Sequence, residues 1–359
     1  MDRWITHSTP VTIVDDGWHN AFTDLTWWRG SLWCAFRRAP THGIVPPGVI
    51  TIYKQDYPPE EHDALSWHHR STLSRNNTDL RDPRFLATPQ RLYCLLGAYH
   101  PRPGVQALSN NSAENTIQTY ITSTKDGHTW TPLTPILRPG SWGWSSLVLP
   151  RRRQDLVYVA AYHTGQSHTE TSSIVLWGGT SFASLMPIGT IYDGSSLQAD
   201  GGPHYSPAEP VLFRTMTGAL GCCVRSESTM DLGIGLSPYQ APQWRWRDTG
   251  SWIHPSATLA TPQGTLLTGR LVSEPGRDPV RGRRDVTPRV GLWRLTGDAP
   301  QLLGLLPSYG DCAYAGLVAG ATPGTVHLSY YTQQPPTGSI EDTRGAAVQI
   351  VTVTLEDIL

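Results

Sequence analysis

The stretch "RDPRFLATPQRLYCLLGAYH", Arg81–His100, contains two short apolar runs separated by a Thr-Pro-Gln turn. Apolar runs of this length, broken by turn-forming residues, predict a β-hairpin. The same arrangement recurs along the chain, and a third apolar run, such as "GVITIYKQD" at 48–56, follows each hairpin. The second runs start 46 to 64 residues apart, at Ser31, Arg91, Asp155, Gly218, Gly264 and Gly324. The sequence therefore predicts six similar antiparallel units.

A unit of three or four strands cannot bury both faces of its own sheet, so several units stack around an axis as a β-propeller. We predict an all-β fold, a single domain over residues 1–359 that forms a six-bladed β-propeller with four-stranded antiparallel blades. The chain ends on a third strand, so the run Trp4–Val14 is expected to pair beside Val348–Val353 and close the ring. A tandem of β-sandwiches is the alternative architecture.

Composition limits the function. The 359 residues carry a formal net charge of −1, which gives no reason to expect nucleic acid or a membrane surface as a partner. Lys54 and Lys125 are the only lysines, so the cations are almost all arginines, which favour planar, bidentate recognition of anions. The N-terminus lacks the apolar core of a signal peptide, and no apolar run reaches about 18 residues. We expect a cytoplasmic monomer.

The five cysteines lie in apolar, strand-like runs without the spacing of a metal or redox motif. They are Cys34, Cys94, Cys222, Cys223 and Cys312. We expect buried free thiols, no disulfide between distant cysteines, and neither a metal nor a cofactor.

Strand ends of a propeller meet in a central funnel, so aligning the six units also aligns the candidate site. The second strands end with Arg37, Tyr99 and His100, Tyr162 and His163, Arg225, Arg270, and Tyr330 and Tyr331, and the first strands begin with Asp24, Asp82, Ser145, Glu209, Ser256 and Tyr314. Arginines that converge from three units repel one another unless an anion lies among them. The pattern predicts a carboxylate, sulfate or phosphate ligand. Alternatively, Asp82 and Glu209 only hold the arginines in place.

Several short motifs resemble those of the sialidase superfamily, and the order of the units agrees over essentially the whole chain. "TKDGHTW", Thr124–Trp130, resembles the Asp-box turn of these propellers, and "HNAFTDL", His19–Leu25, resembles bacterial sialidase-like proteins. "CAFRRAP" is similar to the Phe-Arg-Ile-Pro signature, which implies that Arg37 is the first arginine of the family's arginine triad. "AEPVLFRTMTGALGCCVRSE", Ala208–Glu227, and "DCAYAGLV", Asp311–Val318, resemble segments that imply roles for Glu209, Arg225 and the nucleophile Tyr314.

Two assignments stay open. The third arginine is Arg289 by resemblance to the strand before an Asp box, or Arg270 by the alignment of the units. The general acid is Asp82, Asp24, or one of the loop residues Asp56 and Asp63.

The resemblance implies an exo-acting, retaining glycoside hydrolase of the sialidase type that cleaves an anionic glycan or glycoside. Tyr314 would attack the sugar with Glu209 as its base, and the arginines would bind the sugar carboxylate. A polysaccharide lyase is the alternative enzyme, because His19, His42, His100 and Tyr99 could bind a uronate or abstract its proton. A non-catalytic glycan-binding propeller is a third possibility.

Overall fold

The computed structural model describes residues 5–56, 66–101, 115–150, 154–163, 173–193, 207–225, 230–235, 244–272, 288–296, 299–333 and 345–355. Nearly all of the secondary structure in these ranges is β-strand, apart from the short 3₁₀ helix η3 (Phe182–Ser184). None of the helices in the described ranges is long and apolar enough to cross a membrane.

Four sheets are separate, antiparallel and four-stranded. The first contains β7 (Asp79–Ala87), β8 (Leu92–Pro101), β9 (Asn115–Thr124) and β10 (Thr134–Ile136), and the second contains β11 (Ser141–Leu149), β12 (Leu156–His163), β13 (Ser173–Gly179) and β14 (Met186–Asp193). The third contains β15 (Ala208–Arg214), β16 (Leu220–Arg225), β17 (Met230–Gly235) and β18 (Trp244–Asp248). The fourth contains β19 (Ile253–Thr261), β20 (Gly264–Leu271), β21 (Arg289–Thr296) and β22 (Ala299–Leu305).

The remaining strands form one nine-stranded sheet. It contains β3 (His19–Trp28), β4 (Ser31–Ala39), β5 (Val49–Gln55) and β6 (Trp67–Leu73), together with β23 (Ala313–Ala319), β24 (Thr325–Gln333), β25 (Ala346–Leu355), β1 (Ile5–His7) and β2 (Val11–Val14). Both parts are antiparallel, and a single parallel pair, Ala346 with His19, joins them. The expectation of separate four-stranded sheets throughout is therefore wrong at this seam, because the first and last units share backbone pairing where the chain closes on itself.

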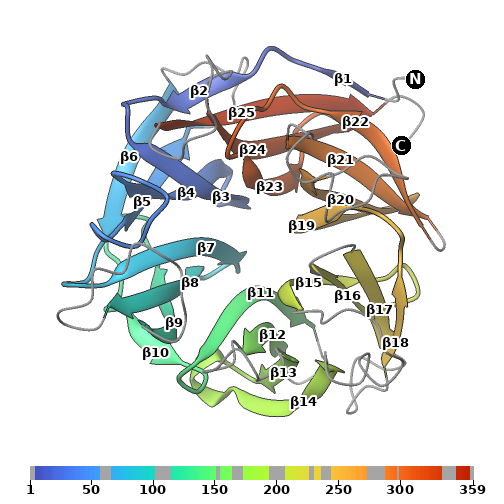
Figure 1. The fold of residues 1–359 in the computed structure, drawn as a ribbon, viewed down its shortest axis with the longest axis horizontal. Coiled ribbons are helices and arrows are strands. Elements are labelled where there is room, and N and C mark those ends of the chain that lie inside the picture. The colour runs from blue at the N-terminus through green and yellow to red at the C-terminus, as the bar shows by residue number, and fades with distance from the viewer. Residues whose placement is uncertain are drawn as a thin grey trace.

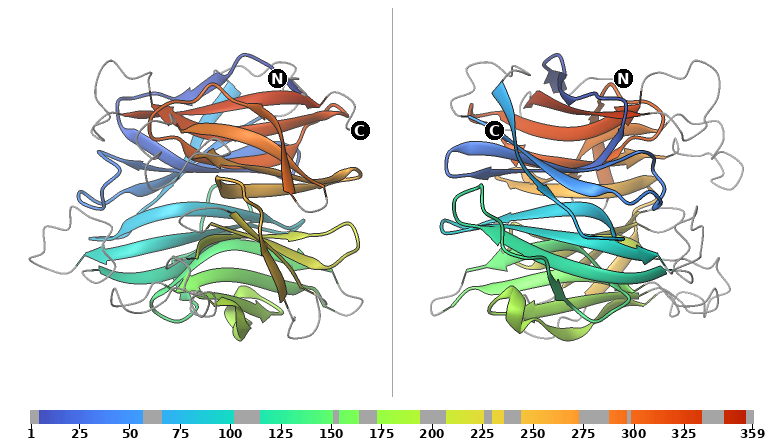
Figure 2. Two further views of the ribbon diagram at one scale, coloured as in Figure 1. Left: turned by 45° about the vertical axis from the view of Figure 1, so that its right-hand side comes forward. Right: turned by 90° about the vertical axis from the view of Figure 1, so that its left-hand side faces the viewer.

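The first strands of successive units line the centre of the molecule (Figure 1). Each of β3, β7, β11, β15, β19 and β23 contacts the next, and β23 contacts β3, which closes the ring. The side views show the twisted sheets packed face to face around this ring (Figure 2). The architecture is an all-β propeller with antiparallel, four-stranded blades.

The two ends of the chain close the ring as the sequence predicted. β1 pairs with β25 from Ile5 opposite Leu355 to His7 opposite Val353. β2 pairs with the same strand, with Val11 opposite Ile350. This pairing covers an edge of β25 that would otherwise be open to another chain.

The hydrophobic core is divided among the interfaces between neighbouring sheets. Strand alternation places successive side chains on opposite faces, so each sheet contributes to two such interfaces. The adjacent residues Cys222 and Cys223 illustrate this, because Cys222 packs toward Tyr158 whereas Cys223 packs in the central cluster with Met230. All five cysteines are buried and free.

A tight turn between β9 and β10 docks against the neighbouring sheet. Asp126 Oδ1 accepts hydrogen bonds from the backbone N–H groups of His128 and Thr129, each at 2.8 Å. Gly127 has φ +80, and a Cβ atom there would lie 2.3 Å from the Trp33 ring. Glycine is therefore required twice, once for the left-handed backbone and once for the close approach.

Gly127→Ala should lower the free energy of unfolding by about 2–4 kcal/mol, because the methyl group adds a steric clash to the left-handed strain. Gly30→Ala is the matched control, since Gly30 has φ +75 but no atom within 4 Å of the added Cβ. That variant should lose only about 1–2 kcal/mol. Chemical denaturation of both variants measures the difference, and equal losses would show that the Trp33 contact does not constrain the turn.

Candidate functional site

The first strands share an irregularity at equivalent positions, and these positions form the candidate site. The register of each first strand shifts near its start, at Ala21/Asp24, Arg81/Arg84, Gly143/Ser145, Ala208/Val211, Pro255/Ala257 and Ala313/Gly316. Four residues in these bulges have left-handed backbones, namely Phe22 (φ 60), Asp82 (φ 51), Glu209 (φ 54) and Tyr314 (φ 37). Such strain in non-glycine residues is typical of functional sites, where a bulge re-aims a side chain.

Tyr314 and Glu209 form a hydrogen-bonded pair. The Tyr314 hydroxyl donates to Glu209 Oε1 at 2.7 Å, and Arg225 Nη1 lies 2.5 Å from the same oxygen. Both Tyr314 and Glu209 are buried. Burial and the Glu209 charge raise the pKa of Tyr314 well above its ordinary value, although Arg225 and Arg270 oppose this. The phenol is therefore protonated at rest, with a carboxylate positioned to take its proton.

Arg270 interacts electrostatically with Tyr314, whereas the guanidinium of Arg289 bonds a backbone carbonyl. Burial opposes the charge of Arg270, but the Tyr314 and Tyr331 hydroxyl groups raise its pKa overall. The Arg289 guanidinium instead donates to the Leu306 carbonyl at 3.2 Å. Of the two candidates for the third arginine, Arg270 is the one whose charge acts on Tyr314.

Asp82 is a buried carboxylic acid in the bulge of β7. Burial raises its pKa to about 6, with a smaller contribution from the Glu209 charge, and Arg84 and Arg81 act in the opposite direction. An aspartate with such a pKa holds its proton at mildly acidic pH and can donate it.

Asp82→Asn should stabilise the protein at pH 8 by about 1–3 kcal/mol. Because the pKa of Asp82 is raised in the folded state, the folded protein binds more protons than the unfolded chain between pH 4 and 6. Stability is therefore lost as pH rises through about 6. Asparagine cannot ionise and tolerates the left-handed backbone. Denaturation at pH 5 and pH 8 should show a gain that grows with pH, and an equal gain at both would contradict the raised pKa.

Arg37 is fully buried and its guanidinium binds groups of the protein itself, so its role as a carboxylate clamp stays a prediction. Its Nη2 lies 2.6 Å from Asp79 Oδ1, Nη1 donates to the Thr41 carbonyl at 2.9 Å, and Nη2 donates to the Gly43 carbonyl at 2.5 Å. Arg81 is the second arginine on Asp79. Arg37 therefore positions the segment that follows β4.

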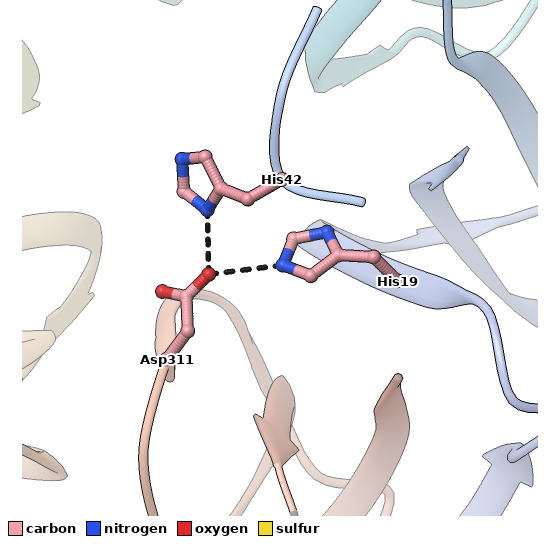
Figure 3. Close-up of side chains that lie close together, drawn as sticks. All are labelled: His19, His42 and Asp311. Atoms are coloured by element: carbon pink, nitrogen blue, oxygen red, sulfur yellow. Dashed lines mark hydrogen bonds and ion pairs between the residues drawn. The ribbon is translucent and has the colours of Figure 1, made fainter. Parts of the chain in front are cut away.

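His42, which lies in that segment, and His19 converge on Asp311 (Figure 3). His42 Nδ1 lies 2.6 Å and His19 Nε2 lies 2.9 Å from Asp311 Oδ2. The Tyr331 hydroxyl donates to Asp311 Oδ1 at 3.0 Å. The sequence predicted both histidines as site residues but not the aspartate that brings them together.

Two other predicted residues, Asp24 and His100, have local partners. Asp24 Oδ2 accepts the backbone N–H of Phe85 at 2.6 Å, so Asp24 links β3 to β7. His100 lies 3.2 Å from Thr78 Oγ1 and 3.3 Å from the Tyr120 hydroxyl. These contacts give both side chains structural partners, and the roles of Asp24 as a candidate acid and of His100 as a residue that binds or deprotonates a uronate stay predictions.

Tyr99 belongs to an aromatic wall near the bulges. Its ring centroid lies 4.8 Å from that of Trp142, and burial raises the pKa of Tyr99 to about 12. Trp144, which occupies the bulge of β11, has its ring centroid 5.2 Å from Tyr314. Sequence alignment of the units had selected the neighbouring residue Ser145 instead. That residue bonds Pro210 and Leu212 on β15.

Of the loop candidates for the acid, Asp56 is exposed and pairs with Lys54 at 2.6 Å. Asp63 lies outside the described residues.

No family model matches the sequence, and no curated protein matches it. Solved structures do match. The α-L-arabinanase of Penicillium chrysogenum has a TM-score of 0.61 and 13% identity, with 99% of this chain and 100% of that chain covered. Trypanosoma rangeli sialidase in complex with sialic acid has a TM-score of 0.62 and 9% identity over 99% of this chain, which spans 60% of that protein. The GH93 α-L-arabinofuranosidase of Fusarium graminearum has a TM-score of 0.56 and 10% identity, with coverage of 96% and 97%. The chain therefore shares the β-propeller fold of these glycosidases.

Proposed function

We propose that the protein is a retaining, exo-acting glycoside hydrolase that cleaves a sugar bearing a carboxylate, with Tyr314 as nucleophile. The 2.7 Å hydrogen bond from the Tyr314 hydroxyl to Glu209 carries this proposal. The similar structures named above are glycosidases that act on different sugars, which supports carbohydrate cleavage without selecting a substrate. We count six blades. Four are the separate sheets, and within the nine-stranded sheet β3–β6 form one more and β23–β25 another.

A tyrosine nucleophile suits an anionic sugar. A carboxylate nucleophile would be repelled by a carboxylate on the carbon under attack, whereas a neutral phenol is not. Glu209 removes the phenolic proton as the bond to the sugar forms, so negative charge develops only in the transition state. Arg225 lies 3.5 Å from the Tyr314 oxygen and stabilises that charge.

We place cationic and acidic side chains around the Tyr314–Glu209 pair. Arg225 and Arg270 supply cations near Tyr314 to bind the substrate carboxylate. Asp82 supplies the acid that protonates the leaving oxygen, and the same residue then activates water to release the sugar. Because only its protonated form donates, kcat should fall as pH rises through about 6.

One observation favours a second candidate, a polysaccharide lyase. His42 has one ring nitrogen 2.6 Å from Asp311, and the His42 side chain is 28% exposed. A histidine oriented by an aspartate can act as a base and abstract the proton next to a uronate carboxylate.

A panel of glycosides tests the proposal against this alternative. Aryl glycosides of sialic acid, glucuronic acid and L-arabinofuranose would be followed by aglycone release, and the first sugar product by proton NMR. We expect hydrolysis of a carboxylate-bearing sugar with retention at the anomeric carbon. An unsaturated uronate product from a polymer would identify a lyase, and preferential cleavage of the arabinofuranoside would refute the carboxylate as the recognised group.

A further inference from the structure

The segment that follows β4 is held by two buried arginines through three successive carbonyl groups. Arg37 donates to the carbonyls of Thr41 and Gly43, and Arg81 Nη2 donates to the His42 carbonyl at 2.6 Å. Asp79 in turn pairs with both arginines. Such an arrangement removes the backbone freedom of one partly exposed residue, His42, and presents its ring in a defined place.

Asp311 holds the rings of His19 and His42 in place (Figure 3). Burial alone would raise the pKa of Asp311, but the hydrogen bonds from His19 and His42 hold it well below its ordinary value. The ionised carboxylate has no proton to donate, so each imidazole must turn an N–H toward it. For a neutral His42 this places the proton on Nδ1 and leaves the lone pair on Nε2, which points away from the aspartate.

His42 lies within reach of a sugar bound at Tyr314. The ring centroid of Phe22 is 5.3 Å from that of His42 and 5.3 Å from that of Tyr314, so one phenyl ring separates them. The His42 side chain is 28% exposed, whereas the His19 side chain is fully buried. Of the two histidines, His42 is the one that a ligand can contact.

We propose that His42, oriented by Asp311, binds substrate by accepting a hydrogen bond through Nε2 from a hydroxyl group of the sugar whose anomeric carbon faces Tyr314. This rests on the proposed function. The recognised substrate is then a sugar with a carboxylate toward Arg225 and Arg270 and a hydroxyl donor toward His42. Asp311 is a positioning residue, and Arg37 and Arg81 position the segment that carries the histidine.

Two histidine nitrogens and a carboxylate could also hold a metal ion, since their ligand atoms all lie within 4.8 Å of one another. Two contacts favour the hydrogen-bonded arrangement. Arg270 Nη1 lies 3.8 Å from Asp311 Oδ1, which opposes a divalent cation. His19 Nδ1 is buried without a hydrogen-bond partner among the described residues, whereas a metal-bound histidine almost always donates its second N–H.

Nitrogen-15 NMR of the histidine rings tests the orientation without any substrate. In the wild type, at a pH where the His42 spectrum is that of the neutral ring, His42 should be the Nδ1–H tautomer, and Asp311→Asn should shift it toward a mixture. Adding Zn²⁺ at one equivalent should leave both ring spectra and Tm unchanged. An Nε2–H tautomer would overturn the inference, and so would stoichiometric Zn²⁺ binding that shifts His19 and His42 together.

Steady-state kinetics test the proposed hydrogen bond between the sugar hydroxyl and His42. With the glycoside that the wild type cleaves, His42→Ala should lower kcat/KM about ten- to a hundredfold, and His42→Gln should lose less because its carbonyl still accepts a hydrogen bond. His100→Ala is the control and should match the wild type, since His100 bonds Thr78 and Tyr120. An unaltered kcat/KM in His42→Ala would refute the contact.

A failure of the hydrolase proposal can be told apart from a failure of the His42 contact. If the wild type cleaves none of the glycosides, that function is wrong, and sialic acid and glucuronic acid become the probes. A change in the His42 Nε2 resonance on adding either sugar would still support the contact, and its absence would refute it.

Discussion

Tyr314→Phe should lower kcat by at least about a thousandfold, because the variant lacks the oxygen that forms the bond to the sugar. The fold should be unchanged, since phenylalanine keeps the ring contacts with Phe22 and Trp144. Single-turnover rates with a carboxylate-bearing aryl glycoside measure the chemical step directly. Tyr330→Phe is the matched control, because the Tyr330 hydroxyl bonds Pro307 and Gln349 instead and its removal should not alter kcat.

Glu209 should act in the same chemical step as Tyr314. Glu209→Gln cannot accept the phenolic proton, and the double variant with Tyr314→Phe should be little slower than either single variant, because two residues that act in one step are not additive. A Tyr314→Phe variant that keeps kcat within about tenfold of the wild type would show that the nucleophile is another residue.

Arg270→Ala should lower kcat/KM for a carboxylate-bearing glycoside about ten- to a hundredfold, because a charged hydrogen bond contributes about 1.5–3 kcal/mol. Arg289→Ala is the control, since its guanidinium bonds the Leu306 carbonyl and it should retain wild-type kcat/KM.

A change of substrate tests whether Arg270 binds the sugar carboxylate. If the guanidinium of Arg270 binds the sugar carboxylate, the wild type and Arg270→Ala should cleave the corresponding methyl ester at similar rates. A loss that is equal for the acid and the ester would show that Arg270 acts elsewhere, and a loss in Arg289→Ala alone would reverse the assignment of the third arginine.

The sequence predicted the propeller because each unit repeats the same hairpin, which is local information. The pairing of Ile5–His7 and Val11–Val14 with the last strand was also predicted, since a unit of three strands leaves an edge that needs a neighbour. The shared nine-stranded sheet could not be foreseen. It depends on one backbone pair, Ala346 with His19, between residues at opposite ends of the chain.

The candidate site was predictable only in part. Glu209, Arg225, Tyr314 and Asp82 were found because the alignment placed them at strand ends. The β-bulges displaced the alignment in two units, so Asp24 was selected in place of Phe22 and Ser145 in place of Trp144. A bulge adds one residue and shifts the inward–outward alternation by one position, but near the start of a strand too few residues precede the bulge for that shift to be recognised in the sequence.

Asp311 and Asp79 were missed for a different reason. Asp311 lies three residues before Tyr314 in the quoted motif "DCAYAGLV", but its partners His19 and His42 are far away along the chain. Asp79 likewise binds Arg37, a residue of the preceding unit. The role of Arg37 as a clamp stays a prediction.

Covalent trapping would identify the nucleophile. The protein would be incubated with a fluorinated glycosyl fluoride of the sugar that it cleaves, digested, and its labelled peptide sequenced by mass spectrometry. We expect one sugar attached to the Tyr314 oxygen, in a peptide that contains "DCAYAGLV", and no label in Tyr314→Phe. A label on Glu209 or Asp82, or hydrolysis with inversion and no label, would contradict this expectation.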